Sequence, residues 1–374
     1  MSALESAAAR ELPASDDLAG TFTDVSSAAG RSQEEIGAIL ADLHFGTIFT
    51  DHMARLTYRE GEGWHNPRLE DYGPLSLDPS AAVLHYGQEV FEGLKAYRHA
   101  DGSLWTFRPG YNAARFNASA RRMAMPEIDP RDFLGSIIDL VRADGAYVPQ
   151  LPGALYLRPY MFSSEPFLGV RAARDYEFLT IASPVGAYFT HGFQPVDIWV
   201  DDVYHRAGPG GTGEAKTSGN YAASLLPQQE AAERGFEQVC FLDSTTGTLI
   251  EELGGMNVFV SYRDGSVATP ALSGTILEGG TRSAILRLLA DRGVVAREVP
   301  LPLAQLLKDL KADRIAEIFA CGTAAVVTPI GRLAGREFDV QVPTGELTVE
   351  LFDELTGIQA GTREDTYGWM YRLS

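Results

Sequence analysis

Apolar residues along this 374-residue chain recur with two periods, one helical and one alternating. Ala113, Phe116, Ala120 and Met123 have the spacing of neighbours on one face of a helix, and Pro126 follows as a stop signal. The pattern therefore predicts a helix over residues 108–125. The same reasoning predicts helices at residues 32–43, 132–145, 220–235 and 281–293, the last capped by Thr281 and Gly293.

Short runs rich in β-branched and aromatic residues predict strands between these helices. The Asp101-Gly102 pair predicts a hairpin from the apolar stretch 84–97 into a strand at 104–107. The remaining predicted strands lie at residues 154–163, 176–185, 196–202, 237–243, 247–253, 257–262, 314–322 and 324–333. The strands cluster instead of alternating strictly with helices, which predicts an α+β (mixed α/β) architecture.

Chain length favours two domains, because one domain usually takes roughly 150 residues. Residues 1–40 are rich in Ala, Ser, Asp and Glu, with Phe22 as the one aromatic, and we expect a flexible acidic segment that ends in a short helix. We expect a small α+β domain at 41–185, a Gly-, aromatic- and Pro-rich interdomain loop at 186–195, and a larger α+β domain at 196–374.

The formal net charge of −19 argues against a nucleic-acid binder, which needs a basic face for phosphates. It disfavours an anionic membrane surface for the same reason. No apolar run approaches the roughly 20 residues that span a bilayer, and Glu5, Arg10 and Glu11 interrupt any signal-peptide core. By elimination we expect a soluble cytoplasmic protein.

Cysteine and histidine give no sign of a metal site. Cys240 and Cys321 have the wrong spacing for zinc and are too few for a disulfide scaffold, so we expect two free buried thiols. The histidines form no HExxH or Cys/His ligand pattern, and no GxSxG motif is present.

The most unusual stretch is RAGPGGTGEAKTSGNYAASLL, in which five glycines surround Lys216. A P-loop is rejected because Glu214 and Ala215 separate the lysine from the last glycine before it. A dinucleotide fingerprint is weak because Pro209 lies inside it and Gly219 would break the required helix. Two readings stay open: a solvated loop lysine, or a lysine that forms a Schiff base with an aldehyde cofactor.

Paired acids stand in the apolar stretch IEELGGMNVFV. Strand alternation sends Glu251 and Glu252 to opposite faces, so we expect one to be solvated and the other buried. A buried carboxylate needs a cationic partner, and a protonated pyridine nitrogen is one candidate. An exposed acidic pair on an edge strand is the alternative.

Two glycine–threonine turns offer backbone amides to an anion. LEGGTRSAILRL runs from a turn into a helix N-terminus, which suits a phosphate, although Thr281 is equally compatible with an ordinary N-cap. FACGTAAVV supplies the second turn. Arg115 beside Phe116 could reach an anion or extend into solvent. Arg158 shares a strand face with Tyr156, which is an unusual place for a guanidinium.

Taken together, these residues resemble the branched-chain amino acid aminotransferases, which belong to fold-type IV of the pyridoxal-phosphate enzymes. The resemblance runs from about Phe45 to the C-terminus and rests on seven segments in order: FGTIFTDHM, LHYGQEVFEGLKAY, YLRPYMFSSEPFLGV, SPVGAYF, KTSGNYAASL, EELGGMN and GTAAVVTP. It implies a two-domain fold whose large domain binds pyridoxal 5'-phosphate. It further implies a homodimer that moves amino groups reversibly between leucine, isoleucine or valine and 2-oxoglutarate.

The resemblance also implies a role for each site residue. Lys216 would carry the cofactor and shuttle the proton, Glu252 would pair with the pyridine nitrogen, and Tyr221 would bond the phenolic oxygen. Residues that would hold the phosphate are Arg115, Gly280, Thr281 and Thr323. The substrate carboxylate would meet Tyr86 and the backbone around Thr323 and Ala324. The walls of the pocket would be Phe45, Phe91, Tyr156 and Tyr188, and Arg158 would pair with the glutamate side chain.

Two alternatives remain. One is a D-amino acid aminotransferase or aminodeoxychorismate lyase of the same fold, although those chains should lack the YLRPYMFSSEP stretch. The other is a binding protein that has lost its chemistry, against which the intact Lys216, Tyr221 and Glu252 argue.

Overall fold

The structure is a computed structural model that describes residues 2–186 and 193–374. The chain forms two compact units. Unit 1 comprises Met1–Tyr188, Ala215–Ser218 and Gly357–Ser374, and unit 2 comprises Phe189–Glu214 and Gly219–Thr356. The short segment with Lys216 and the C-terminal stretch thus belong with unit 1, which differs from the single boundary expected at 186–195.

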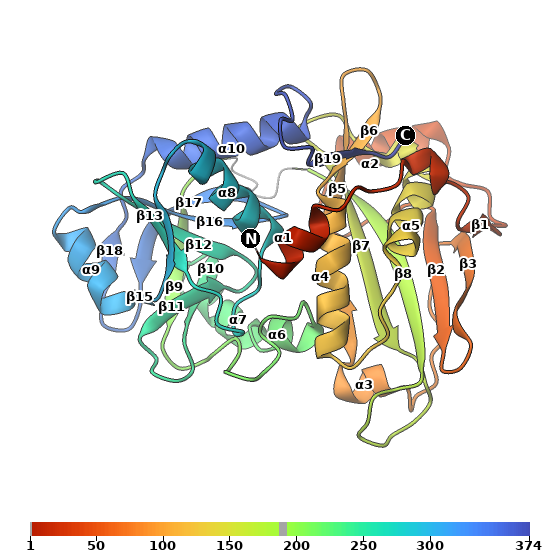
Figure 1. Ribbon diagram of the computed structural model, residues 1–374, viewed down its shortest axis with the longest axis horizontal. Coiled ribbons are helices and arrows are strands. Elements are labelled where there is room, and N and C mark those ends of the chain that lie inside the picture. The colour runs from red at the N-terminus through yellow and green to blue at the C-terminus, as the bar shows by residue number, and fades with distance from the viewer. Residues whose placement is uncertain (1, 187–192) are drawn as a thin grey trace. The chain divides into compact units, whose positions relative to one another are not determined.

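The sheet of unit 1 is mixed, with strand order β1-β3-β2-β8-β7-β5-β6-β19 and β4 paired to β7 (Figure 1). Its strands are β1 (Thr23–Asp24), β2 (His52–Arg59), β3 (Gly63–Asp71), β4 (Glu89–Phe91), β5 (Leu94–Arg98), β6 (Leu104–Phe107), β7 (Ala154–Ser163), β8 (Asp175–Val185) and β19 (Met370–Arg372). The expected hairpin is confirmed, since β5 and β6 pair antiparallel and Gly102 adopts φ +88° in the turn.

Helices α4 and α5 cover one face of this sheet (Figure 1). The helical elements of unit 1 are α1 (Ala3–Ala8), α2 (Gln33–Ala41), α3 (Ala82–Tyr86), α4 (Pro109–Arg122) and α5 (Pro130–Ala143), with short 3-10 turns at Ser15–Asp17 and Gly145–Tyr147. Ala113, Phe116 and Ala120 lie in the core as the helical spacing predicted. Alternation along β7 divides that strand between the two faces of the sheet. Leu155, Leu157 and Met161 join the core, whereas Tyr156 and Arg158 lie on the opposite face.

Residues 1–40 differ from the flexible segment that their composition predicted. Leu18 and Phe22 are 1% and 3% exposed within the core of unit 1. The Asp139 carboxylate on α5 accepts the Gly20 and Phe22 amides at 2.7 and 2.8 Å. The few apolar side chains of this segment find a place in the core, and an acidic residue of α5 satisfies the backbone beside them. The expected short helix is confirmed as α2, which begins with a capping box.

The sheet of unit 2 has the strand order β14-β13-β12-β16-β17-β9-β10-β11-β15, with β18 paired to β17. Its strands are β9 (Val196–Asp201), β10 (Gln238–Leu242), β11 (Leu249–Leu253), β12 (Asn257–Tyr262), β13 (Val267–Pro270), β14 (Ala296–Val299), β15 (Leu301–Pro302), β16 (Ile315–Gly322), β17 (Val326–Ala334) and β18 (Asp339–Gln341). The antiparallel pairing of β16 with β17 confirms the predicted late strand pair.

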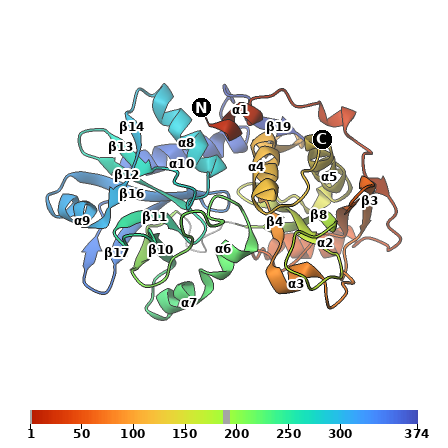
Figure 2. The ribbon, with the colours of Figure 1, turned by 60° about the horizontal axis from the view of Figure 1, so that its bottom comes forward.

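The remaining helices are α6 (Ser218–Ala222), α7 (Leu225–Glu233), α8 (Gly280–Asp291), α9 (Leu303–Lys311) and α10 (Glu346–Gln359). Helices α7 and α8 lie on opposite sides of the unit 2 sheet (Figures 1 and 2). The prediction of a single helix over 220–235 is wrong, because a turn at Ala223–Ser224 interrupts the helix. Pro227 has no amide to donate to the Ala223 carbonyl, so a continuous helix would lose a bond there.

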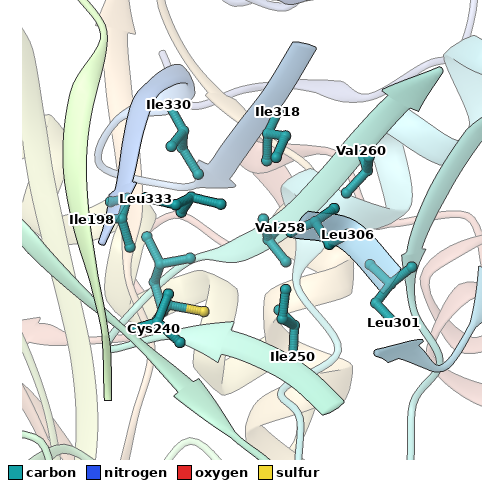
Figure 3. Close-up of a pocket in the computed structure, with 12 residues that line it drawn as sticks. Ile198, Cys240, Ile250, Val258, Val260, Leu301, Leu306, Ile318, Ile330 and Leu333 are labelled. Atoms are coloured by element: carbon teal, nitrogen blue, oxygen red, sulfur yellow. The ribbon is translucent and has the colours of Figure 1, made fainter. Parts of the chain in front are cut away.

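A small cavity in the core of unit 2 is lined only by apolar side chains and Cys240 (Figure 3). Its lining residues are Ile198, Val200, Cys240, Ile250, Leu253, Val258, Val260, Leu301, Leu306, Ile318, Ile330 and Leu333. None of the predicted site residues lines it, so this cavity belongs to the packing of the core. Both cysteines are free and buried, as expected. Across the described residues, no helix has the length and apolar character needed to cross a membrane.

Candidate active site

Lys216 is held by backbone contacts to unit 1. Its amide donates to the Ser119 hydroxyl on α4 at 2.9 Å, and its carbonyl accepts from the Phe91 amide at 3.0 Å. The next residue, Thr217, donates its hydroxyl to the Glu89 carbonyl at 2.6 Å. Strand β4 and helix α4 therefore fix the lysine backbone, and the side chain needs no part in that anchoring.

The Lys216 side chain lies against an aromatic ring that also carries a guanidinium. Lys216 Nζ is 4.6 Å from the centroid of the Phe91 ring, and Arg158 Cζ is 4.7 Å from the same centroid. Arg158 donates to the Tyr156 hydroxyl at 3.1 Å, and Phe45 packs edge-on against Tyr156 at 5.1 Å between centroids. The structure thus brings together five predicted residues: Lys216, Phe91, Arg158, Tyr156 and Phe45.

Tyr86 does not fall within this group. The Tyr86 hydroxyl donates to the Leu168 carbonyl, and the residue is 44% exposed. Tyr188 lies outside the described residues.

Arg115 forms a buried ion pair with Glu92. Its Nε and one Nη donate to the two carboxylate oxygens at 2.7 and 2.8 Å, and Asn112 donates to the same carboxylate at 2.7 Å. Arg115 and Glu92 are 4% and 0% exposed. The guanidinium is neither solvated nor mobile, because a bidentate partner fixes its plane. Sequence analysis missed Glu92, whose signal was an acidic residue in the middle of the apolar run 84–97.

In unit 2, Glu252 on β11 is 3% exposed, and several donors surround its carboxylate. One oxygen accepts from Arg206 and from the Leu277 amide, both at 2.8 Å, and the other lies 3.5 Å from the Asn257 amide nitrogen. A cation and neutral donors together favour the ionised carboxylate in a buried place. An anion held in this way fits the protonated nitrogen of a pyridine ring.

Glu251 is also buried, at 6% exposure, so the expectation of one solvated and one buried acid is wrong. Thr275 donates to one of its oxygens, and the other oxygen is buried without a hydrogen-bond partner. Burial raises the pKa of Glu251, although the Thr275 hydrogen bond lowers it in part. Packing covers both faces of β11, which alternation alone could not reveal.

The N-terminus of α8 lies beside the Glu252 group. Gly279 precedes the helix, and a Cβ there would stand 2.1 Å from Asn257 Oδ1, so only glycine allows this approach. Thr281 lies inside the first turn and Gly279 is the N-cap residue, which corrects the predicted N-cap position of Thr281. Gly280 is the first helical residue, so its amide and that of Thr281 point out of the helix end and suit a phosphate.

The second glycine–threonine turn joins β16 to β17. Gly322 packs against the Gly255–Met256 turn, where an added Cβ would be 3.2 Å from Met256 Cγ. Thr323 and Ala324 follow in the turn, and Val326 then adopts φ +62°, a strained conformation for a β-branched residue. The Tyr221 ring borders the same Gly255, 4.0 Å from an added Cβ. Tyr221, Gly255 and the Thr323 turn are therefore neighbours within unit 2.

Sequence analysis missed two residues that organise this part. Arg206 is 4% exposed and also donates to the Gly213 and Thr275 carbonyls at 3.2 and 3.0 Å. Asn257 donates to the Leu277 carbonyl at 3.0 Å. The signal for Arg206 was available, because a buried Glu252 demands a cation and this arginine opens the glycine-rich stretch.

Comparisons with known proteins agree with this chemistry. The family described as Amino-transferase class IV matches residues 89–333. The branched-chain-amino-acid aminotransferase of Mycobacterium tuberculosis is 52% identical over 344 residues, which are 90% of this chain and 94% of the relative.

Solved structures are similar as well. The branched-chain amino acid aminotransferase of Escherichia coli is 26% identical with a TM-score of 0.72, covering 86% of this chain and 100% of that one. The branched-chain aminotransferase of the archaeon Thermoproteus uzoniensis, solved with norvaline, is 25% identical with a TM-score of 0.72, again covering 86% and 100%. A third such enzyme, solved with pyridoxamine 5'-phosphate, is 26% identical with a TM-score of 0.70, covering 86% and 99%. The chain belongs to the class IV aminotransferase family and, within it, to the branched-chain-amino-acid aminotransferases.

Proposed function

We propose that this protein transfers amino groups reversibly between leucine, isoleucine or valine and 2-oxoglutarate, with pyridoxal 5'-phosphate as its cofactor. The observation that carries this proposal is the Phe91 ring, against which both Lys216 and Arg158 lie. Such a surface offers apolar contact to an aliphatic side chain and a guanidinium to an acidic one.

When bound, pyridoxal phosphate supplies a ring that withdraws the electron pair left on an amino acid after loss of its Cα proton. In this proposal Lys216 Nζ would hold the cofactor, take the proton from substrate Cα and deliver it to C4′ of the cofactor. Glu252, paired with Arg206, would accept a hydrogen bond from the ring nitrogen and favour its protonated form. Tyr221 bonds the phenolic oxygen.

The remaining site residues would bind charged groups and exclude water. Arg115, the amides of Gly280 and Thr281, and Thr323 would hold the phosphate. Tyr86 and the backbone at Thr323 and Ala324 would take the substrate carboxylate. Phe45, Phe91, Tyr156 and Tyr188 would enclose the aliphatic side chain, and Arg158 would take the side-chain carboxylate of glutamate.

We also propose a cytoplasmic homodimer with amino acids and 2-oxo acids as its small-molecule partners. Leu84, Tyr86, Leu168 and Val170 expose 44–88% of their surface on and near α3. Apolar side chains gathered in this way favour an interface with a second copy of the chain. Static light scattering should return twice the 40.6 kDa chain mass, and a monomer at micromolar concentration would reject this part.

The absorption spectrum of the purified protein, before and after borohydride, tests the main proposal. We expect a yellow species that borohydride bleaches, with the cofactor then fixed to the peptide that contains Lys216. Lys216→Ala should keep the fold, because only the lysine backbone bonds to Ser119 and Phe91. Its turnover of leucine with 2-oxoglutarate should fall by about 10³-fold or more. Absence of a chromophore after addition of pyridoxal phosphate would overturn the proposal.

A further inference from the structure

The two cations on the Phe91 ring stand close to a carboxylate with no role in the proposed reaction. Glu89 lies two residues before Phe91 on β4 and therefore on the same face of the sheet, whereas Val90 between them is in the core. A Glu89 oxygen accepts the Ser218 amide at 3.0 Å. The carboxylate thus sits beside the lysine-bearing segment and on the face that carries Arg158.

The charges in this group affect one another. Burial raises the pKa of Glu89 overall, although the hydrogen bonds to Ser218 and the charges of Arg158 and Lys216 lower it in part. Tyr160 also faces Glu89, and burial raises the pKa of Tyr160 to about 12, so that residue adds no charge at neutral pH. When ionised, the Glu89 carboxylate is an anion that offsets the two cations on this face.

Arg158 keeps unused donor capacity. One of its nitrogens donates to Tyr156, but its Nε is buried without a hydrogen-bond partner. A guanidinium with a spare N–H group can donate a hydrogen bond to the carboxylate of a ligand. How strongly it attracts that carboxylate depends on the fixed negative charge nearby, because charges at a partly buried site interact through a low effective dielectric.

We propose that Glu89 determines the balance between the two substrate classes. Its carboxylate offsets the charge of Arg158 when an aliphatic side chain occupies the site and weakens the binding of a side-chain carboxylate. Glu89 would then act as a specificity-determining residue through Arg158, without itself touching the reacting atoms. This inference rests on the proposed function.

The test compares two unreactive ligands on the enzyme loaded with its cofactor. Glutarate carries the second carboxylate of glutamate, and 4-methylpentanoate carries the side chain of leucine. Titration calorimetry gives the dissociation constant of each. Glu89→Gln keeps an oxygen acceptor for the Ser218 amide but removes the charge. We expect this variant to bind glutarate about tenfold tighter, which corresponds to about 1.4 kcal/mol, and to bind 4-methylpentanoate equally well or a few-fold more weakly.

Three further variants sharpen the result. Glu89→Asp keeps the charge and should leave the preference near that of the wild type. On an Arg158→Met background, Glu89→Gln should no longer change glutarate binding. Glu62→Gln removes an exposed charge in the β2–β3 turn and should change the dissociation constant of neither ligand. The KM for glutamate should fall in Glu89→Gln relative to that for leucine.

The role of Glu89 would be overturned if Glu89→Gln changed the dissociation constants of both ligands equally. It would also be overturned if Glu89→Gln still tightened glutarate binding on the Arg158→Met background. Wild-type enzyme that turns over neither amino acid would overturn the proposed function instead. The two failures are therefore distinguishable.

Discussion

Two charged sites, one in each unit, hold their groups in opposite ways. In unit 1, Lys216 and Arg158 rest on the Phe91 ring, and one Arg158 nitrogen has no partner. In unit 2, Glu252 is surrounded by a guanidinium, a backbone amide and a side-chain amide. Groups on an aromatic face can change partners when ligands of different charge arrive. A carboxylate in a complete set of donors keeps one state and one orientation. The cations on the Phe91 ring can therefore adapt to the charge of a ligand, whereas Glu252 keeps one arrangement.

Arg206→Met gives the largest expected effect, because it leaves Glu252 buried without its cation. Loss of one member of a buried ion pair costs about 3–5 kcal/mol. Thermal and urea unfolding should show this loss. The double variant Arg206→Met/Glu252→Gln should recover a large part of it, since no uncompensated charge remains.

Arg282→Met is the matched control. Arg282 is as buried as Arg206, at 3% exposure, but the side chain of its partner Glu298 is 47% exposed. Water can solvate Glu298 after the arginine is gone, so the cost should be clearly smaller. Equal losses at Arg206 and Arg282 would mean that packing, and not the charge of Glu252, explains both.

These contacts also mark the limit of sequence analysis. Lys216 stands out among glycines, and the pair Glu251 and Glu252 stands out in an apolar strand. Only the resemblance to the aminotransferases selected Glu252 from that pair. Asn257 and Ser119 could not be predicted, because their partners come from distant segments and appear only when the chain folds.

The fold divides in the same way. Helix α5 and strand β7 follow from local periodicity and were predicted closely. The break between α6 and α7 depended on a single proline, Pro227, inside a favourable helical pattern. The composition of the N-terminal segment wrongly predicted a flexible chain, because an average hides the two side chains that enter the core, Leu18 and Phe22.

The second prediction concerns this N-terminal segment, which extends the comparison to the way each unit is assembled. Unit 1 takes core residues from stretches far apart in sequence, including Phe22 and Leu373. Phe22→Ala should therefore destabilise unit 1 by about 3 kcal/mol. Val25→Ala, at a residue 54% exposed, should stay within about 0.5 kcal/mol. Similar small effects in both variants would mean that the segment contributes nothing to the core of unit 1.

The smallest expected effect separates Glu251 from its neighbour Glu252. Both are buried, but Glu251 has a hydroxyl donor on one oxygen and no partner on the other. Burial raises the pKa of Glu251 above the ordinary value of 4.5. Below pH 4.5 the group is neutral in the folded and unfolded chain alike. Between the ordinary and the raised pKa only the unfolded chain ionises, so the wild type loses stability as pH rises through that window.

Glu251→Gln cannot ionise and escapes this loss. The stability of the variant relative to wild type should therefore increase from pH 5 to pH 8. Unfolding midpoints of both proteins across this range measure the difference. A difference that stays constant with pH would show that Glu251 ionises as readily in the folded chain as in the unfolded one. The missing hydrogen-bond partner on one Glu251 oxygen would then have no effect on its ionisation, and the contrast drawn with Glu252 would lose its basis.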